Sequence, residues 1–413
     1  MDRSVRARAG RFALAGVLAG SLLAVGAPLT VVAAAEGGCE AVNGTVQLPD
    51  VVEGKFNVAM VLIGPHDDAG WSEAHYDGLI HLCENMADSH VAYVELVPEG
   101  ADAEQVFRSL SRKGFDMIIG TSFGYMDAMA AVAEEFPDIT YLHTTGYKSN
   151  GRNFGNLMGA MEDFTYLAGM LSGSRAKADG NPKLGYAATF PIPEVVRLGN
   201  AFMLGAKVTC PECTMDVRYI NTWHDPVKER EGAASLFDAG AQVVFTGADT
   251  AANADVAAEK GKWAVTHKHY RSCANDACLT APYWMWGPEY TRIAELARNG
   301  EYVGGADYFD ADSGSIGLYG FMDGQEAMPG IADLPAEDVA LVRETLAKFL
   351  SGEMNRFDVF AGEIRDSTGA VVVPAGEKMD QADLEQFVRI EDGGMCRFCM
   401  KFWVEGVNGE IPS

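Results

Sequence analysis

Short apolar runs rich in β-branched residues alternate with amphipathic stretches over most of the chain, a pattern typical of a parallel sheet flanked by helices. In the first part they succeed one another at Phe56–Ile63, Ser72–Met86, Val91–Leu96, Ala103–Lys113, Met117–Ile119, Tyr125–Glu135 and Ile139–His143. A helix is expected over Asp163–Ala178, and strands then follow at Lys183–Ala187, Asp216–Ile220, Gln242–Thr246 and Lys262–Val265. The sequence therefore predicts an α/β protein with two doubly wound parallel-sheet lobes.

These two units divide the chain into discontinuous domains. We expect a signal peptide at 1–35, an N-terminal extension at 36–54, lobe 1 at 55–165 with about 283–320, lobe 2 at 166–282 with about 321–360, and a C-terminal hairpin and Cys-containing tail at 361–413. Open α/β sheets bind ligands at the C-terminal ends of their strands. Two such edges, joined by a hinge, can close around a small molecule.

The first residues have the composition of an export signal. Arginines at positions 3, 6, 8 and 11 precede an apolar stretch over Phe12–Leu29, and small residues at Ala33–Ala35 offer a cleavage site. No basic stop-transfer cluster follows the stretch, which argues against a membrane anchor. The apolar-small motif Leu18–Gly20 is followed by Ser21 rather than by the cysteine of a lipoprotein. We therefore expect a periplasmic protein without a lipid anchor.

Charge and missing motifs exclude several partners. The formal net charge of −26 repels nucleic acid and anionic lipid, so neither is expected as a main partner. No later apolar run is long enough for a membrane span. The chain has neither a Walker A lysine motif nor GxGxxG, and its histidines lack metal-ligand spacing. We expect no cofactor and no metal.

Eight cysteines in an exported chain are expected to form disulfides. Six are close in sequence and suggest the pairs Cys210 with Cys213, Cys273 with Cys278, and Cys396 with Cys399, which leaves Cys39 and Cys83 for each other. The alternative is a four-cysteine zinc site made from the first and third of these pairs. About 180 residues separate those pairs, against ~15–20 in zinc ribbons, so disulfides are favoured.

The first strand ends in a polar loop that includes Asp68 and Trp71, just before a helix. A side chain there lies at the ligand-binding edge of the predicted sheet. The indole of Trp71 can stack on a flat ring, and Asp68 can accept hydrogen bonds from it. In the alternative interpretation, Trp71 is a core residue and Asp68 caps the helix.

The third strand leads into Gly120–Gly124, which matches the G-x-S-x-G motif of serine hydrolases around Ser122. Asp249 and then His267 or His269 follow in the chain order of a hydrolase triad. These partners fall in the second α/β unit, whereas a hydrolase builds its triad on one sheet. The motif thus remains an alternative to a binding loop.

Several segments together resemble the BMP (basic membrane protein) family of solute-binding proteins, which carry purine nucleosides or purine bases to ABC permeases. The matching segments are Asp67–Trp71, Thr121–Asp127, Phe190–Val195, Asn221–Glu231, Trp286–Pro288, Val373–Glu377 and Phe402–Val407. The resemblance implies a type I periplasmic binding protein fold. It also implies that a purine lies between aromatic rings of the two lobes.

By position, the resemblance assigns Trp71 and Phe190 as the two aromatic rings. The other residues that it nominates for the ligand are Asp68, Ser122, Phe123, Asp249, Thr250, His269, Trp286 and Asp312. Each of these side chains can alternatively be a core or capping residue.

Two departures from the family pattern bear on the ligand. Nucleoside-binding relatives tend to have an aspartate for the ribose hydroxyls where this chain has Val265–His269, and some have a lysine where it has Asp310–Gly314. We therefore slightly favour a free purine base over a nucleoside. The predicted function is the binding component of an ABC importer, with a permease and its ATPase as partners and no enzymatic activity. A sensor for a membrane receptor and a serine hydrolase using Ser122 are the alternatives.

Overall fold

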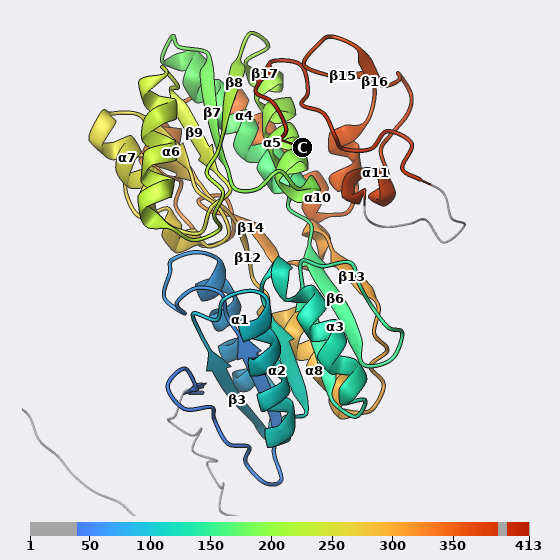
Figure 1. The fold of residues 1–413 in the computed structure, drawn as a ribbon. Coiled ribbons are helices and arrows are strands. Elements are labelled where there is room, and N and C mark those ends of the chain that lie inside the picture. The colour runs from blue at the N-terminus through green and yellow to red at the C-terminus, as the bar shows by residue number, and fades with distance from the viewer. Residues whose placement is uncertain (1–38, 387–394, 413) are drawn as a thin grey trace, which may run out of the picture. The chain divides into compact units, whose positions relative to one another are not determined.

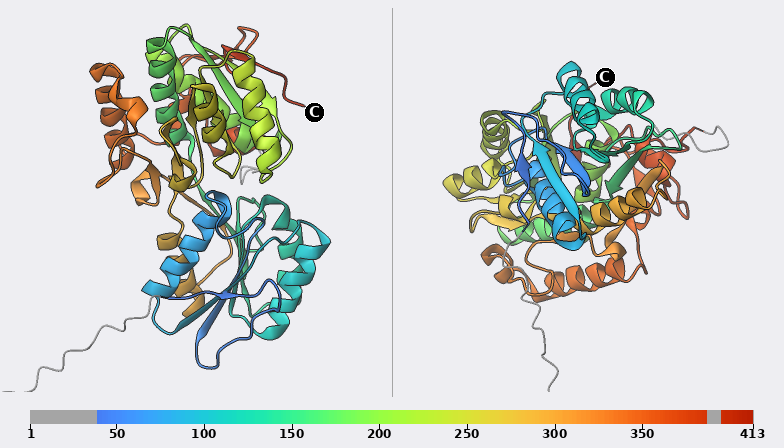
Figure 2. Two further views of the ribbon diagram at one scale, coloured as in Figure 1. Left: turned by 90° about the vertical axis from the view of Figure 1, so that its left-hand side faces the viewer. Right: turned by 90° about the horizontal axis from the view of Figure 1, so that it is seen from below.

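The computed structural model describes residues 39–386 and 395–412, so the signal peptide predicted at 1–35 lies outside the described residues. All described residues belong to one unit, Cys39–Ser413. Within it, two parallel sheets each have helices on both faces (Figures 1 and 2). We call the part built on the first sheet lobe 1 and the part built on the second sheet lobe 2.

The sheet of lobe 1 has seven strands in the order β1-β3-β2-β4-β5-β6-β13. Their bounds are Val42–Asn43 (β1), Phe56–Val61 (β2), Ser89–Val94 (β3), Met117–Gly120 (β4), Thr140–Thr144 (β5), Phe154–Gly159 (β6) and Ala306–Phe309 (β13). All neighbouring strands are parallel. The strand β13 thus returns to the first sheet after five of the six strands of the second sheet.

Successive residues of β2 point to opposite faces of this sheet, as the pleat of a strand requires. Val58 and Met60 belong to the core that includes helices α1 (Trp71–Asn85) and α8 (Gly287–Arg298). Ala59 and Val61 belong to the core with α2 (Ala101–Lys113) and α3 (Met126–Glu135). Because both faces are buried, the strand reads as a continuous apolar run.

The sheet of lobe 2 has the order β11-β10-β9-β7-β8-β17, again with parallel neighbours. The strands are Lys183–Ala188 (β7), Thr214–Tyr219 (β8), Val243–Thr246 (β9), Trp263–Val265 (β10), Cys278–Thr280 (β11) and Val407–Asn408 (β17). The helices are α4 (Glu162–Ala178), α5 (Pro193–Thr209), α6 (Pro226–Asp238) and α7 (Ala252–Lys260).

Helices α4 and α5 pack very closely because glycines lie where they meet. A Cβ on Gly169 would lie 2.0 Å from the carbonyl oxygen of Phe202, and one on Gly205 would lie 1.9 Å from that of Tyr166. Only a residue without a side chain fits at such positions. The close packing fixes the N-terminus of α5, which carries part of the site described below.

The remaining elements connect or extend the lobes. They are β12 (Pro282–Trp284), β14 (Ile316–Leu318), α9 (Pro329–Ala332), α10 (Ala336–Leu350), β15 (Ile364–Arg365), β16 (Val371–Val373), α11 (Gln381–Glu385) and the 3-10 helices Phe123–Tyr125, Tyr270–Ser272, Ala311–Ser313 and Arg356–Phe360. The antiparallel pair β12 and β14 lies where the chain passes between the lobes, and β15 pairs with β16 to form a hairpin in the C-terminal part of the chain.

The predicted fold of two doubly wound sheets is confirmed, with one revision of an element. The apolar run over 278–286, which by itself predicts a single strand, forms two strands, β11 in the sheet of lobe 2 and β12 outside it. The chain leaves the sheet between them, at Ala281, and an apolar run does not reveal where a strand changes partners.

All four predicted disulfides are present, namely Cys39–Cys83, Cys210–Cys213, Cys273–Cys278 and Cys396–Cys399. Pairing all eight cysteines leaves none for the four-cysteine zinc site considered from the sequence. Within the described ranges, the helices are too short or too polar to cross a membrane.

Candidate functional site

Both lobes have a doubly wound order, in which an early strand, β2 in lobe 1 and β7 in lobe 2, lies inside the sheet. In lobe 1 the strand order reverses between β2 and β4, and in lobe 2 it reverses between β7 and β9. Helices leave opposite faces of the sheet at such a point, so a crevice opens beyond the C-terminal ends of the strands. The two switch points are therefore the first places to look for a ligand.

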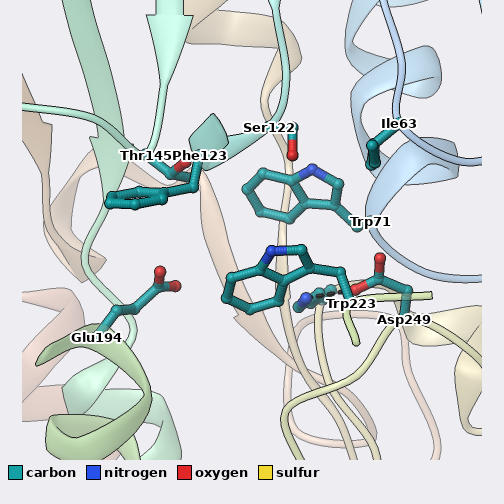
Figure 3. Close-up of a pocket in the computed structure, with 9 residues that line it drawn as sticks. Ile63, Trp71, Ser122, Phe123, Thr145, Glu194, Trp223 and Asp249 are labelled. Carbon is teal, nitrogen blue, oxygen red and sulfur yellow. Dashed lines mark hydrogen bonds and ion pairs between the residues drawn. The ribbon is translucent and has the colours of Figure 1, made fainter. Parts of the chain in front are cut away.

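A pocket with about 330 Å³ of empty space, part of it open to solvent, lies at these strand ends and takes residues from both lobes (Figure 3). Its lining residues are Ile63, Trp71, Ser122, Phe123, Thr145, Glu194, Trp223, Asp249 and Lys268. Each follows the C-terminal end of one of the strands β2, β4, β5, β7, β8, β9 and β10. This pocket is the candidate ligand site.

Three aromatic side chains, Trp71, Phe123 and Trp223, line the pocket. The indole of Trp71 is 6% exposed and is fixed by a hydrogen bond of 2.5 Å from Nε1 to the carbonyl oxygen of Thr121. Trp223 is half-buried and comes from the opposite lobe, and Phe123 lines the same pocket (Figure 3). Such rings provide stacking surface for a flat ligand.

Lys268 and Asp249 form a buried ion pair in the wall of the pocket. The Lys268 ammonium also lies 4.9 Å from the ring centroid of Trp223 and 5.3 Å from that of Trp71. Burial raises the pKa of Asp249, although the Lys268 charge opposes this shift. The pair places a fixed positive charge between the two indoles.

The carboxylate of Glu194 has no hydrogen-bond partner among the described residues and points into the pocket (Figure 3). It lies in the first turn of α5, where the helix dipole favours a negative charge. Burial raises the pKa of Glu194, while the charges of Arg197 and Lys268 lower it. Glu194 is thus a free acceptor for an N–H or O–H group of a ligand.

Unusual backbone conformations gather around the pocket. Thr145 has a φ of 76° and Lys268 a φ of 77°, and Asn221 and Ala69, close in sequence to Trp223 and Trp71, have φ values of 52° and 57°. Residues other than glycine rarely adopt such angles, and functional sites are where the resulting strain is commonly retained. The Oγ1 atom of Thr145 is buried without a hydrogen-bond partner, which leaves it available to a ligand.

The residues of the hydrolase hypothesis do not form a catalytic triad. Ser122 Oγ donates a hydrogen bond of 2.6 Å to Glu99, while Asp249 pairs with Lys268 and His269 Nε2 lies 3.2 Å from Asp77. Neither ring nitrogen of His267 has a hydrogen-bond partner in the described structure. Ser122 has φ −145° and ψ 144°, an ordinary extended conformation rather than the strained turn of a nucleophile elbow.

Four of the nominated ligand residues line the pocket, namely Trp71, Ser122, Phe123 and Asp249. Asp68 lies beside it and accepts hydrogen bonds from the backbone N–H groups of Gly70, Ser72 and Glu73 at the start of α1. Thr250 donates to Glu229 with its hydroxyl and its backbone N–H. Phe190 packs against Trp223 with ring centroids 5.0 Å apart. Phe190 therefore supports the Trp223 indole but does not itself line the pocket.

The other three nominated residues lie elsewhere. His269 and Trp286 line a separate cavity of about 670 Å³ near β12, and Trp286 stacks on His75 and Tyr290. Asp312 is exposed and lines a third cavity of about 340 Å³. These residues do not meet the ligand pocket.

Five lining residues were not nominated from the sequence, namely Ile63, Thr145, Glu194, Trp223 and Lys268. Glu194 and Trp223 lie in segments that carry the family resemblance. Their position after the end of a strand was the signal in the sequence that could have identified them. Lys268 lies in the segment that departs from the family pattern. Its place in the pocket depends on how the backbone turns after β10, which periodicity does not report.

A second pocket of about 310 Å³ adjoins the first and shares Phe123, Thr145 and Glu194 with it. A buried charge network forms its floor. Arg197 pairs with Glu162 and, at 2.8 Å, with Glu385, which also accepts a hydrogen bond of 2.9 Å from the Tyr308 hydroxyl. This network holds the polar groups of the second pocket in place.

Comparisons with known proteins agree on one family. The Bmp family, described as ABC transporter substrate-binding protein PnrA-like, matches residues 55–329. A purine-binding protein of Brucella abortus is 33% identical over 362 residues, covering 87% of this chain and 95% of the relative. A putative ABC transporter glucose-binding protein of Haloferax volcanii is 33% identical over 358 residues, covering 86% and 81%. Among solved structures, a solute-binding protein of an ABC transporter system from Aeropyrum pernix superposes with a TM-score of 0.60 at 17% identity, covering 72% of this chain and 92% of that chain.

Proposed function

This chain belongs to the Bmp family of PnrA-like ABC transporter substrate-binding proteins, and from that premise we propose that its pocket binds a purine base or a purine nucleoside for import. The family is one of extracytoplasmic binding proteins rather than enzymes. Its members take a small-molecule ligand and have a membrane permease as partner. For this chain we propose a periplasmic location and delivery of the purine to the permease and its ATPase.

One observation carries the purine proposal. The pocket joins two indoles from opposite lobes, Trp71 and Trp223, with the carboxylate of Glu194, to which none of the described residues donates a hydrogen bond. A purine presents two flat faces and an edge of N–H donors and ring-nitrogen acceptors. Stacking binds the faces, and the fixed polar groups select the edge.

A sugar is the competing ligand, because one relative is named a glucose-binding protein. A monosaccharide carries hydroxyl groups around its whole ring, and each needs a polar partner once it is buried. Ser122 already has a protein partner, and Lys268 binds one oxygen of Asp249. Among the described residues, this leaves only Oδ2 of Asp249, Glu194 and the hydroxyl of Thr145 as pocket acceptors without a partner. Aromatic walls with few free polar groups favour a purine, and the purine-binding relative supports that choice.

Between base and nucleoside, we slightly favour the base. Where some relatives have an aspartate for ribose, this chain has Lys268 and its neighbours, and Lys268 is engaged by Asp249. A cation in an ion pair cannot accept a hydrogen bond from a ribose hydroxyl. The adjoining pocket nevertheless offers space beyond Glu194, so a nucleoside is the second candidate.

Two measurements test the proposal. Native mass spectrometry of protein purified from cells should show a retained species with the mass of a purine. Calorimetric titration of ligand-stripped protein should then show adenine, guanine or hypoxanthine binding at least as tightly as the matching nucleoside. Nucleosides binding tenfold tighter would reverse the order of the two candidates. Glucose binding with no response to either purine series would remove the purine assignment and leave the family unchanged.

A further inference from the structure

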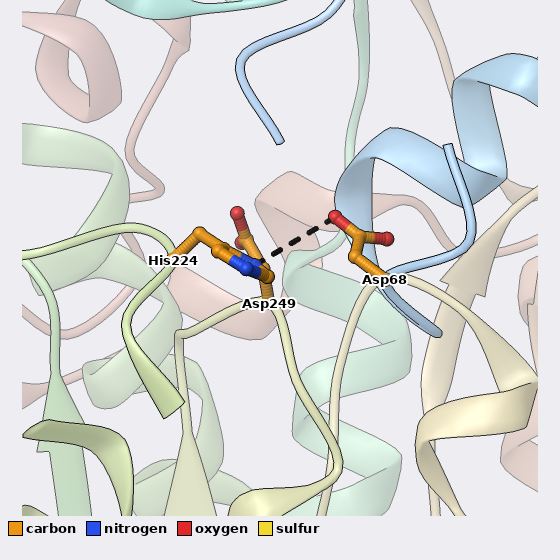
Figure 4. A group of neighbouring side chains, drawn as sticks. All are labelled: Asp68, His224 and Asp249. Atoms are coloured by element: carbon orange, nitrogen blue, oxygen red, sulfur yellow. Dashed lines mark ion pairs between the residues drawn. The ribbon is translucent and has the colours of Figure 1, made fainter. Parts of the chain in front are cut away.

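Three side chains with metal-ligating atoms converge beside the pocket, although they are far apart in the sequence (Figure 4). Asp68 follows β2 of lobe 1, whereas His224 and Asp249 follow β8 and β9 of lobe 2. One ligand atom of each lies within 4.8 Å of the others, and Nδ1 of His224 lies 4.0 Å from Oδ2 of Asp68. The cluster therefore spans the two lobes.

Two of the three groups have an unused polar atom. The Asp249 side chain is fully buried, and while its Oδ1 accepts from Lys268, its Oδ2 has no hydrogen-bond partner in the described structure. Nδ1 of His224 is likewise buried without a hydrogen-bond partner among those residues. A buried carboxylate oxygen without a hydrogen-bond partner lowers the stability of the fold, so its presence here indicates that a ligand binds to it.

The charge around the cluster is negative. A third carboxylate, that of Glu229, is buried next to Asp249 and is held by Thr250 and the backbone of Asp225. Lys268 neutralises one of these carboxylates.

We propose that Asp68, His224 and Asp249 bind a divalent transition-metal ion of the Zn²⁺ type that joins the two lobes. One imidazole and two carboxylates suit Zn²⁺, and an open fourth position would hold water. Two ligands at about 2.1 Å from a tetrahedral ion are about 3.4 Å apart, so the gap of 4.0 Å between His224 and Asp68 needs to close only slightly. Because the ligands come from both lobes, the ion favours their closed arrangement.

Zinc titration of protein without an affinity tag, after treatment with a chelator, tests the site. We expect one Zn²⁺ per chain by calorimetry and at least tenfold weaker binding in His224→Gln. The His224 side chain is 24% exposed, and its Nδ1 makes no hydrogen bond to the described residues, so this substitution should leave the fold intact, which circular dichroism verifies. The matched control is His66→Gln, another histidine beside a carboxylate, 2.8 Å from Glu95, and it should bind as the parent does.

Cobalt provides a second readout that does not depend on a variant. Co²⁺ in a site of low coordination number gives visible d–d absorption, which added Zn²⁺ should abolish stoichiometrically. Absence of a bound ion, equal binding in His224→Gln and the parent, or equal losses in His224→Gln and His66→Gln would each overturn the proposal. No purine enters these titrations, so their outcome is independent of the proposed function.

Discussion

The Lys268 ammonium lies 4.9 Å from the centroid of the Trp223 ring. Lys268 lies in a loop that follows a strand, and its ion-pair partner, Asp249, is fully buried. This contact joins the aromatic and the charged parts of the pocket. The Lys268 ammonium and the Phe190 ring, which packs against the same indole, together orient Trp223. The first expectations concern this ring and the free carboxylate across the pocket.

Trp223→Ala should weaken purine binding strongly. Removal of an aromatic anchor commonly costs about 2–4 kcal/mol, which corresponds to roughly 30- to 1,000-fold in Kd. Calorimetry with the best-binding purine measures the change. Trp263→Ala is the matched control, because Trp263 is a half-buried tryptophan outside the pocket. Equal Kd values for Trp223→Ala and the parent would show that the ligand does not touch this ring.

Glu194→Gln should also reduce affinity, by about 10- to 100-fold, because a hydrogen bond to a charged group contributes about 1.5–3 kcal/mol. The carboxylate accepts hydrogen bonds best when ionised, and burial raises its pKa above the usual 4.5. Binding by the parent should therefore weaken as the pH falls through that raised value. In Glu194→Gln this dependence should be lost.

Hypoxanthine suits the pH series, because it stays neutral over the acidic range. Affinities that vary with pH identically in Glu194→Gln and the parent would assign the titration to another group.

Ser122 should not react as a nucleophile. Its hydroxyl donates a hydrogen bond to Glu99, and no histidine side chain of the described structure makes a hydrogen bond to this hydroxyl. A fluorophosphonate probe should leave the protein unlabelled, as intact mass spectrometry would show. Stoichiometric labelling that disappears in Ser122→Ala would instead revive the hydrolase hypothesis.

The disulfides should differ in their contribution to stability. Cys39–Cys83 closes a loop with a sequence separation of 44, against 3 for Cys210–Cys213. The loop-entropy model predicts about 4 kcal/mol for the first and about 2 kcal/mol for the second. Denaturant unfolding of the two double Cys→Ser variants tests this order.

Alkylation of the exported native protein without reductant should find no free thiol, and six or more labelled cysteines would contradict the pairing.

Asp163 should reduce stability at neutral pH. Its carboxyl is fully buried, one oxygen has no partner in the described structure, and burial together with Glu162 raises its pKa well above 3.8. The folded state thus holds a proton that the unfolded state has lost, so stability falls as the pH rises from the unfolded pKa to the folded one.

Asp163→Asn mimics the protonated form, and we expect it to raise the free energy of unfolding by roughly 1–3 kcal/mol at neutral pH. The gain should disappear near the unfolded pKa, where both states of the parent are protonated. The exposed Asp333→Asn serves as control. A gain that is independent of pH would rule out the titration as its cause.

The fold was predictable because strands buried on both faces read as apolar runs, and β2 is the clearest example. Three of the nine residues that line the pocket were predictable for a related reason, since Trp71, Ser122 and Phe123 follow strand ends at a topological switch point. The assignment of Phe190 as the second ring shows the limit. Phe190 and Trp223 are neighbours, and only the course of the two loops places the indole rather than the phenyl ring at the pocket.

The cluster of Asp68, His224 and Asp249 shows a deeper limit. Metal sites are recognised in a sequence by short ligand spacings, and the sequence therefore predicted no metal. These three residues come together only because two sheets present their strand ends to each other. Contacts between residues of different lobes leave no periodic pattern in the sequence.

The edge strands of both sheets are short: two residues in β1 and β17, three in β11 and four in β13. An edge strand exposes unpaired backbone groups that can recruit a strand from a neighbouring molecule. Edges of this length offer too few such groups for a stable intermolecular ladder. Crowding should therefore not drive strand-to-strand aggregation of this protein, whichever ligand it carries.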